Sequence, residues 1–106
     1  MSTEVRVCLC TVPNAEVGAQ LARGLVESKH AACVNIVPGV RSVYRWKGEV
    51  QDDAELLLII KTSAERFEAM RAWLLEAHPY EVPELLALPV EAGAAPYLAW
   101  VLESLA

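Results

Sequence analysis

The residues most able to do chemistry gather in the segment 78–84, where an imidazole, a phenol and two carboxylates lie around two prolines. The polar side chains of this corner belong to His78, Tyr80, Glu81 and Glu84. A proline fixes its own φ and disfavours the helical region for the residue before it. We therefore expect a helix to stop at His78, before Pro79, and the backbone to hold the side chains of the corner in place.

Three cysteines add thiols to the candidate groups. Cys8 and Cys10 lie two positions apart in a predicted strand, too close for an easy mutual disulfide, so we interpret them and Cys33 as free thiols. A thiolate and an imidazole are suitable donors for Cu(I), Cu(II) or Zn(II), whereas a closed structural site needs about four ligands. A metal site built here would need more donors than one thiol and one imidazole.

Hydrophobic periodicity predicts a strand and then a helix at the start of the chain. Apolar and polar residues alternate over residues 5–10, as in a strand with two different faces. Asn14 can cap the following helix, which we expect to end near Lys29. The predicted buried stripe of this helix consists of Gly18, Leu21, Ala22, Leu25 and Val26.

A long hairpin is predicted next. Residues 32–46 are rich in β-branched and aromatic side chains, with a bend or bulge expected at Pro38-Gly39. Lys47-Gly48 turns the chain, since Gly48 tolerates the positive φ of a tight turn. The return strand runs from Glu49 to Lys61, and its apolar run over 56–60 predicts burial on both faces.

The remaining sequence predicts a helix, a strand and a last helix. Residues 62–65 resemble a capping box for a helix over 67–77 that Pro79 ends. A short strand is expected over 85–90, and Pro96 suits the first turn of the last helix. The order predicts an α+β fold of the ferredoxin-like βαββαβ type, with an antiparallel sheet and an extra C-terminal helix, as one domain over residues 1–106.

This topology predicts which polar groups meet. The end of the first strand, the hairpin turn at 47–48, the end of the second helix and the start of the fourth strand should share one edge of the sheet. Cys10 and His78 are therefore expected to be neighbours. Cys33 falls with Lys61 at the opposite edge and is not expected to join them.

Three motifs make the chain resemble the CutA family of divalent-cation tolerance proteins, and they occur in the family's order. They are Ala-Ala-Cys-Val-Asn at 31–35, Val-Tyr-Arg-Trp-Lys-Gly-Glu at 43–49, and the corner at 78–84. The resemblance implies copper binding by Cys10 and His78, completed by Tyr80, Glu81 or a neighbouring subunit. Ala77 stands where some members have a second histidine. Other divalent cations stay alternatives to copper.

The hydrophobic content predicts an assembly. Hydrophobic residues make up 55% of the 106 residues and the mean hydropathy is +0.30, above the roughly 45–50% that is usual for soluble domains. The resemblance implies a homotrimer joined through long hairpins and sheet edges. We expect Tyr44 and Trp46, beside the hairpin turn, to pack against another subunit.

Composition and motifs disfavour several functions. Nine basic and fourteen acidic residues give a net charge of −5, and no basic run suggests nucleic acid as a partner. No apolar stretch approaches the roughly 20 residues of a membrane span. The first residues lack the features of a secretory signal, so we expect the cytoplasm. No catalytic triad, phosphate-binding loop or dinucleotide motif is present, which predicts a non-enzyme.

Two functions are therefore compared. The first is a cytoplasmic trimer that takes part in divalent metal ion tolerance or response and binds copper. The alternative is a signalling or scaffold trimer, similar in fold to the PII proteins, that binds a small anion or metabolite in clefts between subunits. The basic residues that could serve the alternative are Arg41, Arg45, Lys47 and Lys61.

Overall fold

The computed structural model describes residues 3–106, so the first two residues of the predicted domain lie outside the described part. The elements follow in the order β1 (Val5–Val12), α1 (Ala15–Glu27), β2 (Cys33–Trp46), β3 (Glu49–Ser63), α2 (Phe67–Ala77), β4 (Leu86–Pro89) and α3 (Ala95–Ser104). The predicted α+β class, the βαββαβ order, the long hairpin and the extra C-terminal helix are confirmed.

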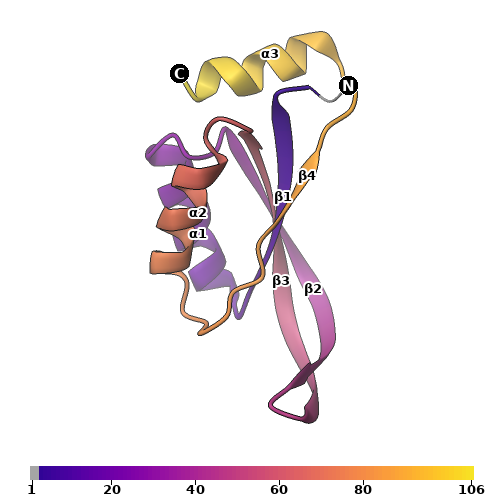
Figure 1. The fold of residues 1–106 in the computed structure, drawn as a ribbon. Helices are drawn as coiled ribbons and strands as arrows, with labels where there is room; N and C mark the ends of the chain where they lie inside the picture. The colour runs from indigo at the N-terminus through magenta and orange to yellow at the C-terminus, as the bar shows by residue number, and fades with distance from the viewer. Residues whose placement is uncertain (1–2) are drawn as a thin grey trace.

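The sheet has the strand order β2-β3-β1-β4, and all neighbouring strands are antiparallel. β1 lies between β3 and β4, with Cys10 opposite Leu58. Helices α1 and α2 lie together on one side of the sheet, while α3 crosses the sheet near the start of β1 (Figure 1). The ends of β1 and α2 therefore lie at the same end of the molecule, as predicted.

The main core lies between the sheet and the helices α1 and α2. It contains Cys8, Cys10, Val12, Leu21, Leu25, Ala31, Leu58, Ile60, Met70 and Leu74. The prediction that residues 56–60 are buried on both faces is wrong. Leu58 and Ile60 are fully buried, whereas Leu57 and Ile59 point to the other face and are only half-buried, because no helix covers that part of the sheet.

The second face of the sheet is covered at one end only. There α3 places Val101 and Leu105 against Val5 and Ala32 in a small second core. The rest, which we call the open face, consists of Val7, Leu9, Leu57, Ile59, Leu86 and Leu88, as the strand pairing shows. The side chains of Leu86 and Leu88 are 57% and 47% exposed. A single chain thus leaves an apolar surface across three strands.

The β2–β3 hairpin projects beyond the rest of the sheet (Figure 1). β1 pairs with β3 only from Leu56 onward, so residues 49–55 extend about 20 Å past the end of β1. Lys47 and Gly48 form a two-residue turn with φ of 50° and 83°, as hairpins of this kind require. The turn lies at the same end of the sheet as Cys10 and His78, as predicted, but the length of the hairpin carries it beyond them.

The predicted bend in β2 is confirmed. The pairing with β3 shifts between Val37 and Val40, around Pro38 and Gly39. Gly39 has a φ of 78°, a conformation that favours glycine because it has no Cβ. The bulge sets the direction in which the outer half of the hairpin leaves the sheet.

The predicted N-terminal cap is present in α1 but not in α2. The side chain of Asn14 accepts a hydrogen bond from the Val17 N–H at 2.9 Å, so the predicted cap of α1 is confirmed. The capping box at 62–65 is wrong, because the Thr62 hydroxyl donates to the His30 carbonyl at 2.7 Å. Ser63 accepts from the Arg66 N–H instead. Val26, predicted in the buried stripe of α1, is 42% exposed.

Candidate functional site

The corner begins where α2 ends. His78 leaves the helix with φ −73° and ψ 138°, while its N–H still donates to the Leu74 carbonyl at 2.9 Å. Pro79 cannot donate a helical hydrogen bond, so the helix stops at this point. The connection from α2 to β4 then passes close to the end of β1 and the base of the hairpin (Figure 1).

His78 braces the corner against β1. Its ring is buried, with 6% exposed. Nε2 lies 2.9 Å from the Thr11 carbonyl oxygen, and Nδ1 accepts the Tyr80 N–H at 3.1 Å. Since Nδ1 accepts, Nε2 carries the proton and donates to Thr11. Both ring nitrogens are therefore engaged with the backbone, and the ring also packs against Tyr80 with centroids 4.8 Å apart.

Cys10 meets His78 at the same backbone group. The thiol is fully buried and its Sγ lies 3.7 Å from the Thr11 carbonyl oxygen. Burial raises the pKa of Cys10 to about 12, and the nearby carboxylates of Glu84 and Glu55 act in the same direction. The structure thus brings Cys10 and His78 together, whereas Cys33 pairs with Lys61 at the other end of β2.

The thiol of Cys10 and the imidazole of His78 are suitable donors for copper. In one chain, however, they do not make up a complete set of metal ligands. The thiol is held in its protonated form, and both imidazole nitrogens already have partners. Residues 3–106 contain no group of three or more His, Cys, Asp or Glu that could hold a metal ion. A copper site here is therefore not preformed within a single chain, and it needs donors from elsewhere.

A hollow of about 720 Å³ lies between the corner and the hairpin. It is lined by Thr11, Ser42, Val43, Tyr44, Trp46, Glu55, Pro79, Tyr80, Glu81, Val82 and Glu84. The predicted site residues Tyr80 and Glu81 and the predicted interface residues Tyr44 and Trp46 all belong to it. The side chains of Tyr44 and Trp46 are 43% and 38% exposed.

Two phenol–carboxylate pairs order the wall of the hollow. The Tyr80 hydroxyl donates to Oε2 of Glu55 at 2.6 Å, and the Tyr44 hydroxyl donates to Oδ2 of Asp53 at 2.6 Å. Burial, followed by the bond to Glu55, raises the pKa of Tyr80. The bond to Asp53 raises the pKa of Tyr44. Both tyrosines therefore stay neutral donors over the physiological pH range.

Sequence reasoning missed Glu55. Its side chain is buried, with 8% exposed, although it belongs to the outer part of β3. The available signal was its position, since it is the charged residue directly before the apolar run at 56–60. The partner that holds it, Tyr80, is distant in sequence, and only the fold brings the two together.

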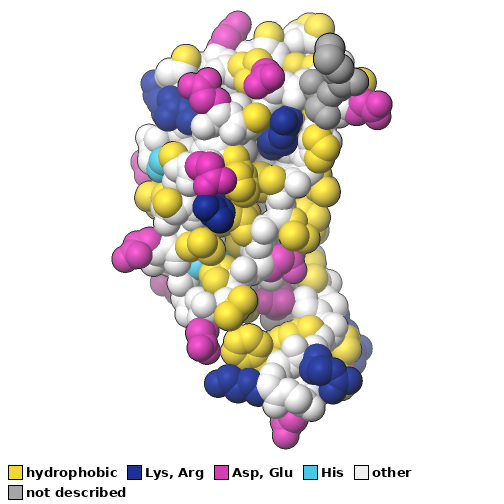
Figure 2. Space-filling view, in the orientation of Figure 1, with side chains coloured by type: hydrophobic (Ala, Val, Ile, Leu, Met, Phe, Trp, Pro, Cys, Tyr) yellow, Lys and Arg dark blue, Asp and Glu magenta, His cyan; other side chains and the backbone are white. Residues whose placement is uncertain are grey.

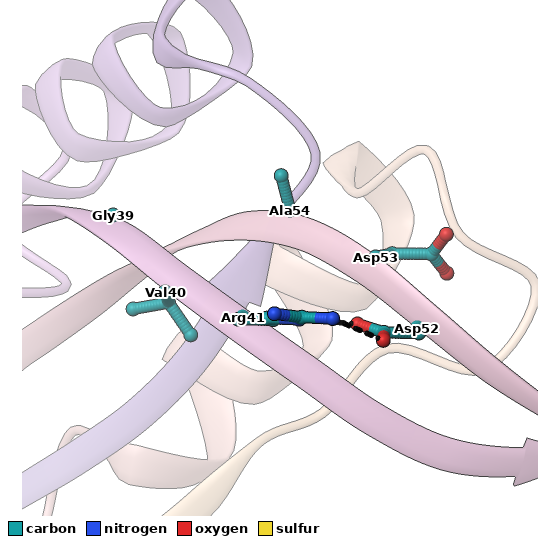
Figure 3. A pocket seen from close by; sticks show the side chains of 6 residues that line it. All are labelled: Gly39, Val40, Arg41, Asp52, Asp53 and Ala54. Carbon is teal, nitrogen blue, oxygen red and sulfur yellow. Dashed lines mark hydrogen bonds and ion pairs between the residues drawn. The ribbon is translucent and has the colours of Figure 1, made fainter.

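Within a single chain, the basic residues named for the alternative function do not line the hollow. Arg41 donates two hydrogen bonds to Asp52, at 2.8 and 2.7 Å, in a smaller pocket on the hairpin where Asp53 points away from the pair (Figure 3). Lys61 donates to Asn35 at the far end of the sheet. Arg45 and Lys47 do not line the hollow. Lys and Arg side chains gather instead over the hairpin turn, at the foot of the view in Figure 2.

The comparisons with known proteins converge. The family model described as "CutA1 divalent ion tolerance protein" matches residues 6–104. The Thermus thermophilus "Divalent-cation tolerance protein CutA" is 50% identical over 98 residues, which are 92% of this chain and 95% of that protein.

Solved structures agree with these matches. The crystal structure of CutA1 from Oryza sativa is 48% identical, covers 97% of this chain and 94% of its own, and has a TM-score of 0.93. A structure from Archaeoglobus fulgidus, titled as a periplasmic divalent cation tolerance protein, is 33% identical with a TM-score of 0.93, covering 96% and 99% of the two chains. The chain spans about half the length of its mammalian and plant chloroplast relatives.

Proposed function

Since this chain belongs to the CutA1 family of divalent ion tolerance proteins, we propose that it acts as a homotrimer in the cytoplasmic response to divalent metal ions. The role is one of binding and assembly, and not of catalysis. One observation carries the proposal: a single chain exposes an apolar sheet face next to a hollow whose charged side chains are all carboxylates.

The open face supports assembly. Leu86 and Leu88 are about half exposed on β4, beside the half-buried Leu9 and Val7 of β1. Contiguous apolar surface of this kind usually marks a subunit interface in a protein that stays in solution. The projecting hairpin presents Tyr44 and Trp46, which are large, partly exposed aromatic side chains of the kind that anchor interfaces.

The carboxylates support an association with cations. Glu55, Glu81 and Glu84 line the hollow. Thr11 also lines it, and the carbonyl group of Thr11 contacts both Cys10 and His78. A negative potential raises the local concentration of cations before any specific ligand binds.

No helix of residues 3–106 is long and apolar enough to cross a membrane. We propose the cytoplasm as the location of the response.

Copper binding through Cys10 and His78 remains the proposal for the metal, with Tyr80, Glu81 or a neighbouring subunit supplying further donors. Copper must displace the thiol proton and at least one of the two hydrogen bonds of the imidazole. Because the pKa of Cys10 is raised to about 12, deprotonation becomes easier as the pH rises. The affinity for copper should therefore increase with pH and fall on acidification.

Calorimetric titration of the purified protein with copper tests this site. We expect Cys10→Ser to weaken binding by at least about tenfold, while Cys33→Ser, at the other end of β2, leaves it unchanged. His78→Ala, checked for folding by circular dichroism, should weaken binding as well. Unchanged affinity in both Cys10→Ser and His78→Ala, or its loss in Cys33→Ser alone, would show that copper binds elsewhere.

The signalling or scaffold function is supported only in part. A hollow of about 720 Å³ has the size of a small-molecule site. Its lining contains three carboxylates and no lysine or arginine, so an anionic metabolite would meet like charges. If the protein binds a small ligand, the chemistry of the hollow favours one that is not an anion.

A further inference from the structure

One lysine lies among the apolar residues of the open face. Lys61 of β3 pairs with Val7 of β1 on one side and with Cys33 of β2 on the other. Residues directly opposite each other in antiparallel strands present their side chains on the same face, and Val7 in turn pairs with Leu88 of β4. The side chain of Lys61 therefore leaves the sheet on the side of the open face, in one row with Val7 and Leu88.

Apolar side chains flank this lysine along the strands. The next residue of β3 on the same face is Ile59, which pairs with Leu9 of β1. In the other direction Val5 is buried under α3. Lys61 itself is half-buried, as is usual where the methylene groups of a lysine cover apolar surface and the ammonium reaches water. A neighbouring chain that covers the open face would cover the ammonium as well.

Within residues 3–106 the ammonium of Lys61 donates to one side-chain acceptor, the amide oxygen Oδ1 of Asn35. That acceptor is neutral and exposed. Lys61 takes part in none of the ion pairs of the described residues, which join Arg23 to Glu27, Arg41 to Asp52 and Arg71 to Glu68. Because an ammonium has three N–H donors, Lys61 can bond to further acceptors.

The charge of Lys61 decides what can cover the open face. Burying an unpaired ammonium is strongly unfavourable, whereas an ammonium that gains a carboxylate and further hydrogen bonds recovers much of the lost hydration. The chain has fourteen acidic residues, and only Glu27, Asp52 and Glu68 are in ion pairs within residues 3–106. A second copy of this chain can therefore supply the missing acceptor.

We propose that a second copy of this chain buries the ammonium of Lys61 and supplies a carboxylate oxygen to it, while Asn35 of the first copy holds the ammonium in place. This inference rests on the assembly proposed above and adds a specific contact to it. An apolar surface without an acceptor opposite Lys61 is then rejected by the open face, so that the lysine selects the partner.

The assembly of a Lys61→Met variant tests this contact, because a paired ammonium and a hydrated one predict opposite results. Methionine keeps an unbranched apolar side chain and removes the charge. If a second copy supplies a carboxylate, that carboxylate stays buried without its partner, and the dissociation constant between subunits should rise by about tenfold or more. If the ammonium reaches water in the assembly, the added apolar surface should lower the dissociation constant instead. Light scattering over a range of chain concentrations, at one fixed concentration of urea, measures the constant.

Two variants serve as controls. Lys61→Arg keeps the charge and should retain more of the assembly than Lys61→Met. Arg71→Met removes a cation on α2, on the other side of the sheet (Figure 1), where Arg71 forms an exposed ion pair with Glu68. Since exposed pairs contribute little, we expect Arg71→Met to leave the dissociation constant unchanged.

A second measurement uses the unchanged side chain and does not depend on the folding of a Lys61 variant. Acetylation of lysine amines, located by mass spectrometry, should spare Lys61 in the assembled protein. In a Leu88→Asp variant that does not assemble, Lys61 should react. Sulfate added at constant ionic strength should leave the dissociation constant unchanged, because the second copy and not a dissolved anion supplies the acceptor.

Three outcomes overturn the proposal. The first is an unchanged or lower dissociation constant for Lys61→Met, and the second is equal acetylation of Lys61 in the assembled and single chains. The third is tighter assembly with sulfate, which would show that a dissolved anion is the partner of Lys61. A single-chain mass for the unchanged protein would instead overturn the assembly itself, so light scattering tells that failure apart from a failure of the Lys61 contact.

Discussion

Replacing Leu88 by aspartate should convert the assembled protein into single chains. Leu88 is 47% exposed on β4 and lies opposite Val7 on the open face. If the open face is covered by neighbouring subunits, the new carboxylate is buried without a partner, at a cost on the order of several kcal/mol per subunit. Light scattering should then give the mass of one chain, against three times that mass for the unchanged protein.

The matched control for this change is Leu75→Asp. Leu75 is 44% exposed, almost the same fraction as Leu88, but it lies on α2, on the other side of the sheet. We expect this variant to remain a trimer.

Trp46→Ala on the hairpin should weaken assembly without abolishing it, since truncation of an interface anchor costs about 2 kcal/mol or more. A monomeric unchanged protein, or a trimeric Leu88→Asp variant, would contradict the proposed interface.

His78→Ala should lower the free energy of unfolding by about 2–4 kcal/mol in metal-free buffer. The change leaves the Thr11 carbonyl and the Tyr80 N–H without the partners that they have at 2.9 and 3.1 Å. It also leaves a cavity where a 6% exposed ring had been. Urea unfolding at a fixed chain concentration, with a chelator present, measures the loss without any contribution from copper.

The other histidine provides the control. Nδ1 of His30 is buried and has no partner among residues 3–106, and the ring lies 6.0 Å from that of Trp73. His30→Ala therefore removes packing but no side-chain hydrogen bond of Nδ1, and should cost clearly less than His78→Ala. Equal losses in the two variants would show that the brace between β1 and the corner contributes little to stability.

The local features of the fold were readable from the sequence. Alternation predicted β1, Asn14 predicted the start of α1, and Pro79 predicted the end of α2, because each depends on neighbours within a few positions. The turn at Lys47-Gly48 followed from the same kind of local rule. The topology alone then placed the ends of β1 and α2 together. The sequence therefore predicted that Cys10 and His78 are neighbours, although it did not predict that both contact the Thr11 carbonyl group.

The errors share a different cause. The capping box failed because the Thr62 hydroxyl has a distant acceptor, the His30 carbonyl. Burial on both faces of β3 failed in the single chain because α1 and α2 cover one face while α3 covers only one end of the other, which the apolar run at 56–60 could not reveal. Glu55 was missed because its burial depends on Tyr80. Each of these depends on contacts between segments far apart along the chain, and no local pattern encodes them.

The length of the β2–β3 hairpin also bears on the order of folding. Trp46 and Glu49 are joined by a two-residue turn, and an isolated hairpin of this kind closes in about 1–10 μs. The ladder between β1 and β4 pairs Arg6 with Pro89, so it must wait for most of the chain to be made and collapsed. We therefore expect the hairpin to pair before β4 closes the edge of β1, and pulsed hydrogen exchange during refolding can measure this order. Until β4 pairs, this edge of β1 is open to wrong pairing with another chain.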